Sequence, residues 1–122
     1  SGDRFAKLML RKAKVRELCG LNFLKCLNSE ITFEKHIEGV YCGDMLSGAL
    51  AEARENDLWL TVQNHKNVAA VAILKKISCI VLSKQEQASE PMLRLCSEND
   101  IAVFASSEDC FTTAVMLYEF LK

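Results

Sequence analysis

The fold of this chain is decided by residues 58–82, which read LWLTVQNHKNVAAVAILKKISCIVL. An apolar run rich in β-branched and aromatic residues, 58–62, is followed by the polar loop 63–67. A helix of small apolar residues comes next, and a second apolar run ends at Leu82. Two such runs joined by a helix predict two parallel strands connected by a right-handed crossover.

The sequence after this unit continues the alternation of strands and helices. The polar loop 83–89 leads to a helix that opens at Glu90-Pro91, because proline is tolerated in a first helical turn. Another apolar run precedes a final helix, 111–121, and Ser106 with Asp109 three residues on has the spacing of a capping box. We expect the apolar side chains of that helix to face inward, namely Phe111, Ala114, Val115, Leu117, Tyr118 and Leu121.

The sequence before the unit predicts two more strands and a helix. Residues 22–27 and 37–42 have the composition of short strands. Residues 45–54 repeat apolar side chains at i, i+3, i+4 and i+7, which predicts a helix, and Asp44 is placed to be its N-cap.

This order of elements predicts a single layered α/β domain whose mainly parallel sheet of four to five strands is flanked by helices. We assign residues 15–122 to this domain. Residues 1–14 are assigned to a tag scar, Ser1-Gly2, and an N-terminal extension, because residues 5–18 have helical spacing with a basic face.

Composition excludes several classes of function. With 122 residues the chain forms one domain, and 15 basic against 16 acidic residues leave a net charge of −1, which predicts no nucleic-acid partner. The apolar runs stop short of the roughly 20 residues that a membrane span needs. No secretory signal is visible, so we expect a cytoplasmic protein without membrane association.

Six cysteines are many for this length, but no two are spaced as C-x-x-C. Cys79 and Cys96 lie inside hydrophobic patterns, where a thiol acts as a small apolar side chain. We therefore expect reduced thiols rather than disulfides, and neither a metal site nor a cofactor.

A polar cluster at the predicted strand ends is the candidate ligand site. In α/β sheets, ligands bind beyond the carboxyl ends of the strands, against helix N-termini. The loop 63–67 offers amides, an imidazole and an ammonium there, a set suited to phosphate or carboxylate. The predicted ligand-binding residues are Gly43, Asp44, Gln63, Asn64, His65 and Asn67. The simpler interpretation is that Asn67 caps the helix and that His65 and Lys66 are solvated.

Catalytic motifs are weak or absent. A Cys42–His65 nucleophile pair is conceivable, yet nothing nearby supplies an oxyanion hole or an orienting third residue. The chain has neither G-x-G-x-x-G nor G-x-x-x-x-G-K-[ST]. We expect no enzyme activity, with a Cys/His-dependent enzyme as a minor alternative.

The helix of residues 68–74 has no polar face before Lys75-Lys76. A helix that is apolar all round has to be covered on more than one side. In a domain of this size the second cover comes from another subunit or from the N-terminal segment. We prefer the subunit and predict a homodimer.

Three ordered motifs resemble the DRTGG-domain family, which is similar to the N-terminal domain of HPr kinase/phosphatase and, more distantly, to the first domain of Mur ligases. They are Gly39–Ser47 (GVYCGDMLS), Asp57–His65 (DLWLTVQNH) and Asn67–Ala72 (NVAAVA). One departure is clear. The family's Thr-Gly-Gly-like turn is expected after the Cys79–Leu82 strand, where this chain has Ser83-Lys84-Gln85. A glycine turn lets backbone approach a ligand closely, so its absence affects any shared site there.

The resemblance implies a regulatory module without established catalysis, found alone or beside CBS pairs and kinase-related domains. Our leading hypothesis is a non-catalytic regulatory or ligand-sensing module that binds a nucleotide or another small anionic ligand. The alternative is a protein-docking subunit of a redox, hydrogenase or kinase-associated system, with a protein partner and no small molecule. The motifs do not name the ligand or the partner.

Overall fold

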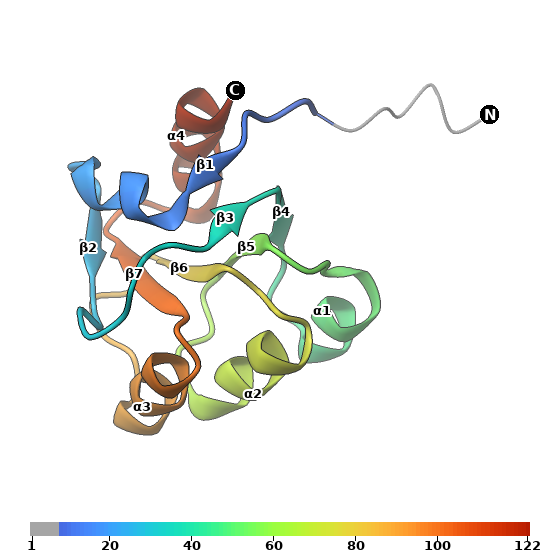
Figure 1. Ribbon diagram of the computed structural model, residues 1–122, viewed down its shortest axis with the longest axis vertical. Helices are drawn as coiled ribbons and strands as arrows, with labels where there is room; N and C mark the ends of the chain where they lie inside the picture. Colours follow the sequence, from blue (N-terminus) through green and yellow to red (C-terminus); the bar gives the residue numbers. More distant parts are fainter. Residues whose placement is uncertain (1–7) are drawn as a thin grey trace.

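The architecture is seen in a computed structural model that describes residues 8–122 (Figure 1). Along the chain the elements are β1 (Ala13–Lys14), the 3-10 helix η2 (Val15–Gly20), β2 (Leu24–Cys26), β3 (His36–Ile37), β4 (Gly39–Cys42), α1 (Leu46–Glu52), β5 (Asp57–Thr61), α2 (Lys66–Leu74), β6 (Cys79–Ser83), α3 (Glu90–Glu98), β7 (Ala102–Ser106) and α4 (Cys110–Leu121). None of the helices in the described residues is long and apolar enough to cross a membrane.

The centre of the fold is a five-stranded sheet with the order β2-β7-β6-β5-β4. The strands β4, β5, β6 and β7 run parallel, and β2 pairs antiparallel with β7 at one edge. The predicted α/β class with a mainly parallel sheet of four to five strands is therefore confirmed. A separate two-stranded ribbon pairs β1 with β3.

Helices cover both faces of the sheet, as Figure 1 shows, with α1, α2 and α3 on one side and α4 on the other. Side chains alternate along each strand between two buried clusters. Trp59 and Ile80 join the cluster under α2 and α3, whereas Leu60 and Val81 join the cluster under α4. Because β5, β6 and β7 are buried on both faces, their sequences read as continuous apolar runs, which is why they could be predicted.

The apolar helix α2 is covered by the chain itself. It packs between α1 and α3, and it buries Val68, Ala69, Val71 and Ala72. Leu74, at its end, remains 70% exposed. The homodimer prediction therefore no longer follows from this helix, because neighbouring helices supply the cover that we had assigned to another subunit.

The predicted helix over residues 5–18 is wrong for residues 8–14, residues 15–18 form part of a 3-10 helix instead of an α-helix, and residues 5–7 lie outside residues 8–122. Residues 8–12 have no regular structure, and β1 and η2 follow. The backbone of Val15 and Arg16 donates hydrogen bonds to the carbonyls of Lys35 and Phe33, at 2.8 and 3.0 Å. These long-range bonds, with Leu18 buried beneath them, replace those of a regular α-helix.

The start of α4 also differs from the prediction. Its N-cap is Asp109, whose Oδ1 accepts a hydrogen bond from Thr112 N at 2.7 Å. Ser106 ends β7 instead, and its hydroxyl pairs with that of Thr113 at 2.8 Å. The inward face is narrower than predicted: Leu117 and Leu121 are buried, but Phe111 is 78% and Val115 42% exposed.

Candidate functional site

The carboxyl ends of four parallel strands meet at one edge of the sheet, where hydrogen bonds join their loops. Ser89 N, before α3, donates to Asn64 O at 2.8 Å, and Lys84 N donates to Glu108 O at 3.0 Å. The side chain of Asn64 donates to Gln85 Oε1 at 3.2 Å and to Gln87 O at 3.1 Å. The loops after these strands therefore meet at one edge, and the side chain of Asn64 connects two of them.

Asp44 binds its neighbouring strand rather than a helix end. Its Oδ1 accepts hydrogen bonds from Thr61 Oγ1 and Val62 N, both at 2.9 Å. The N-cap of α1 is Met45, and no side chain of the described residues caps it. The capping prediction for Asp44 is therefore wrong, because the nearby β5 end offers the carboxylate two donors at once.

Gly43 has a packing role at the same point. Its carbonyl accepts a hydrogen bond from Trp59 Nε1 at 2.8 Å. A Cβ placed on Gly43 would lie 2.8 Å from Tyr41 Oη, and one on Gly48 would lie 2.7 Å from the same oxygen. Tyr41 packs edge-on against Trp59, with ring centroids 6.4 Å apart. The two glycines therefore make room for the Tyr41 ring.

Gly39, the first glycine of the Gly39–Ser47 motif, lies close to the side chain of Asp57. A Cβ on Gly39 would lie 2.6 Å from Asp57 Oδ1, while Asp57 Oδ2 accepts a hydrogen bond from Arg54 N at 2.8 Å. Asp57 is buried at the start of β5, next to β4. The motif residues of β4 and β5 thus hold these two strands together.

Apart from Asn64, the polar side chains between β5 and the first turn of α2 lie outside such contacts. His65 occupies the N-cap position of α2, and within residues 8–122 no side chain caps that helix. The His65 Nε2 lies 2.9 Å from Gln63 Oε1 on the surface. Lys66 and Asn67, the first helical residues, are exposed. Asn67 does not cap the helix, so the alternative that it does is wrong.

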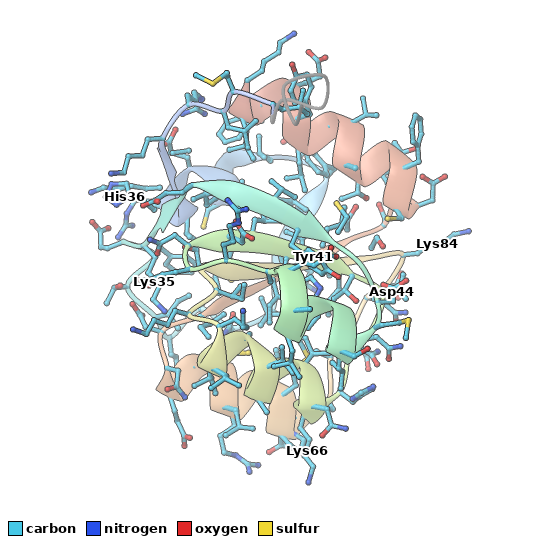
Figure 2. All side chains as sticks on the ribbon, turned by 90° about the vertical axis from the view of Figure 1, so that its right-hand side faces the viewer. Lys35, His36, Tyr41, Asp44, Lys66 and Lys84 are labelled. Carbon is cyan, nitrogen blue, oxygen red and sulfur yellow. The ribbon has the colours of Figure 1, made fainter. Side chains whose placement is uncertain are left out.

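Lys84 stands where the glycine turn was expected. Its φ of 55° is in the left-handed region, so the backbone makes such a turn although a lysine occupies it. The preceding Ser83 hydroxyl is buried, and no described residue gives it a hydrogen-bond partner. The side chains of Lys66 and Lys84 extend away from the body of the molecule in different directions (Figure 2).

These two lysines were not among the predicted site residues. Lys66 was counted only as part of the loop, and Lys84 was noted only as a departure from the family pattern. A positive charge beside the N-terminus of α2 is a signal for an anion that the sequence does contain.

The structure gives no support to a thiolate nucleophile at Cys42. Burial raises the pKa of the Cys42 thiol, and Cys110 and Asp44 raise it further. A catalytic cysteine needs the opposite shift. Within residues 8–122 no hydrogen bond joins Cys42 to His65, and no three His, Cys, Asp or Glu side chains gather in a way that could hold a metal ion.

Comparison with known proteins gives a family and a fold. The family model described as the DRTGG domain matches residues 23–120. A solved structure, the CBS and DRTGG domains of the regulatory region of Clostridium perfringens pyrophosphatase complexed with its activator diadenosine tetraphosphate, is similar with a TM-score of 0.71 and 15% identity. The similarity covers 96% of this chain and 54% of that one, about half its length. Curated proteins gave no significant sequence match.

Proposed function

Because the chain belongs to the DRTGG-domain family, we propose that it is a non-catalytic regulatory module that senses a nucleotide or another small anionic ligand. The observation that carries the proposal is that some polar groups at the carboxyl edge of the sheet are bonded within the fold and others are exposed to solvent. Gly43, Asp44 and Asn64 are engaged in the fold, whereas His65 and Asn67 are exposed.

The exposed groups suit an anion. His65, Lys66 and Asn67 stand at the N-terminus of α2, where the helix dipole favours negative charge. Gln63 extends this surface through its contact with His65. Lys84, on the next loop, points in a different direction from Lys66 (Figure 2), so its contribution needs a separate test. Hydrogen bonds from charged donors to phosphate are about twice as strong as neutral ones.

The similar pyrophosphatase region is a regulatory region, and its structure contains a nucleotide activator. That finding supports nucleotides as the first class of ligand to test. The cysteines at 19, 26, 42, 79, 96 and 110 are free. Free thiols are typical of a reducing compartment, which supports the proposal of a cytoplasmic module.

The test is thermal unfolding of the whole chain with ATP, AMP, diadenosine tetraphosphate or pyrophosphate. A ligand at about 100 times its dissociation constant stabilises by roughly 2.7 kcal/mol, which raises the midpoint clearly. We expect His65→Ala with Lys66→Ala to abolish the shift. The matched control is Lys25→Ala, which removes an exposed lysine from the outer strand β2, away from the N-terminus of α2.

If none of these compounds shifts the midpoint of the wild-type chain, the sensing proposal fails. If the ligand still raises the unfolding midpoint of the His65→Ala, Lys66→Ala double variant, the binding site does not lie at the N-terminus of α2. The protein-docking alternative predicts no shift with any small molecule.

A further inference from the structure

The strand β4 is an uncovered edge of the sheet. It pairs with β5 on one side, and along its other side runs a groove of about 990 Å³. One wall of the groove is the end of α1 and the connection to β5, with Glu52, Arg54 and Glu55. The other wall is α4, with Ala114 and Tyr118. Backbone groups on an open strand edge are a template for pairing with another strand.

This edge lacks the features that block such pairing. Proteins protect exposed edges with lysine, proline or bulges. The residues of β4, Gly39-Val40-Tyr41-Cys42, include neither lysine nor proline, and no bulge interrupts their register with β5. At the opposite edge, β2 carries the exposed Lys25 at its centre.

An exposed apolar stripe lies beside the same edge. On α4 it consists of Phe111 and Val115, and Tyr118 continues it into the groove. Val40 of β4 is 37% exposed, and Leu8, which also lines the groove, is 68% exposed. Phe111, Val115 and Tyr118 share one face of α4 by their i, i+4, i+7 spacing, and apolar side chains exposed together in this way are typical of an interaction site.

We propose that this face binds a second copy of the chain, with β4 pairing antiparallel to β4 across a two-fold axis perpendicular to the sheet. The pairing joins two five-stranded sheets into one. The same axis brings the two α4 helices together on one face, so that each apolar stripe covers the other. An extended peptide would satisfy the strand edge but leave Phe111 and Val115 in water, whereas a second copy satisfies both.

Charge is compatible with self-association. The groove wall alternates in sign along Glu52, Arg54 and Glu55, and Lys75 adds a second base. A two-fold copy can therefore place acids opposite bases. The net charge of −1 per chain adds little repulsion between copies. Two-fold contacts of one patch with itself are also the commonest form of homo-oligomer.

The experiment is sedimentation velocity of the full chain over a concentration series. We expect a dimer for the wild type. Val40→Lys and Val115→Glu each place like charges across the axis and should raise the dimer dissociation constant by about a hundredfold. Met45→Lys changes a side chain that is 71% exposed outside the groove, and Ala70→Lys changes the exposed side of α2. These two controls should dimerise as the wild type does.

Amide hydrogen exchange gives a second measurement that does not depend on any variant folding. Exchange within Gly39–Cys42 should slow as the protein concentration rises, while exchange in Leu24–Cys26 should not change. A wild-type chain that is monomeric at every concentration overturns the proposal and leaves the edge to a strand from another protein. A dimer that Ala70→Lys dissociates, or that Val40→Lys and Val115→Glu leave intact, overturns it as well. None of these outcomes depends on the ligand proposed for the α2 N-terminus.

Discussion

Two groups of motif side chains lie close together at the carboxyl edge of the sheet, and the fold uses them in opposite ways. At the end of β4 and on β5, Asp44 Oδ1 and Trp59 Nε1 have partners inside the chain. At the start of α2, Lys66 and Asn67 are exposed, and in the described part of the chain the His65 ring has one hydrogen-bond partner, its neighbour Gln63. A dense polar motif is therefore not in itself a binding site.

The difference follows from what burial costs. A polar group that leaves water without a partner loses about 1–3 kcal/mol, so buried motif residues come with fixed partners. Asp44 is exposed, but its Oδ1 accepts two such bonds from the end of β5, which fix the side chain in one place. Exposed side chains at a helix N-terminus keep their hydrogen-bonding capacity and can be used for recognition.

Trp59→Ala should show the largest effect in the first group. Trp59 is fully buried between the sheet and its helices, packs against Tyr41 and donates to Gly43 O. Truncation of a buried Trp leaves a cavity and lowers the free energy of unfolding by about 3–5 kcal/mol. Urea unfolding followed by circular dichroism measures this loss.

The matched control is Leu74→Ala, because Leu74 is 70% exposed and lies outside the proposed dimer face. Its effect on the free energy of unfolding should stay within about 0.5 kcal/mol. If Trp59→Ala cost no more than this control, the β4–β5 contacts would not be structural and the comparison would fail.

Asp44→Ala should have an intermediate effect and decides to which group Asp44 belongs. It leaves the buried Thr61 Oγ1 without its acceptor, which costs about 1–3 kcal/mol of unfolding free energy, while the exposed Val62 N can donate to water. Asp44→Asn keeps an oxygen acceptor at that position and should lose less. Chemical denaturation of both variants, with and without the ligand identified by thermal shift, separates the two roles.

A ligand-binding Asp44 would give the reverse pattern. Asp44→Ala would then unfold like the wild type and lose ligand binding. Unchanged stability in that variant would return Asp44 to the candidate site and remove the distinction between the two groups.

The sequence predicts well what depends on local pattern and poorly what depends on partners far along the chain. The strands β5, β6 and β7 could be predicted because both their faces are buried, which gives continuous apolar runs. Residues 5–18 have a helical pattern, yet hydrogen bonds from Val15 and Arg16 to the 33–35 segment replace the expected helix in the described part.

The cap prediction for Asp44 failed for a related reason, because its carboxylate accepts from Thr61 at the end of β5, seventeen residues away. The prediction for Ser106 failed locally: Asp109, three residues later, is the N-cap, and the Ser106 hydroxyl pairs with Thr113 inside the same helix. Within the site, sequence could identify the polar loop but not which of its side chains are engaged. Asn64 contacts Gln85, twenty-one residues away, and no local pattern contains that information.

Lys84→Gly should have the smallest effect and tests whether Lys84 is retained for its charge. An L-residue pays about 1–2 kcal/mol for the left-handed conformation that Lys84 adopts, while glycine costs about 0.5–1 kcal/mol in lost chain entropy. The variant should therefore gain about 0.5–1 kcal/mol of unfolding free energy, and it restores a glycine to the turn where the family pattern has one. If Lys84 binds the anion, this more stable variant binds more weakly, so stability and affinity change in opposite directions.

Lys84→Asn is the control, because asparagine tolerates the left-handed region and carries no charge. It should lose affinity to the same extent with a smaller change in stability. If the wild type and both variants bind the ligand equally, Lys84 does not contact the anion, and the binding surface is limited to the N-terminus of α2.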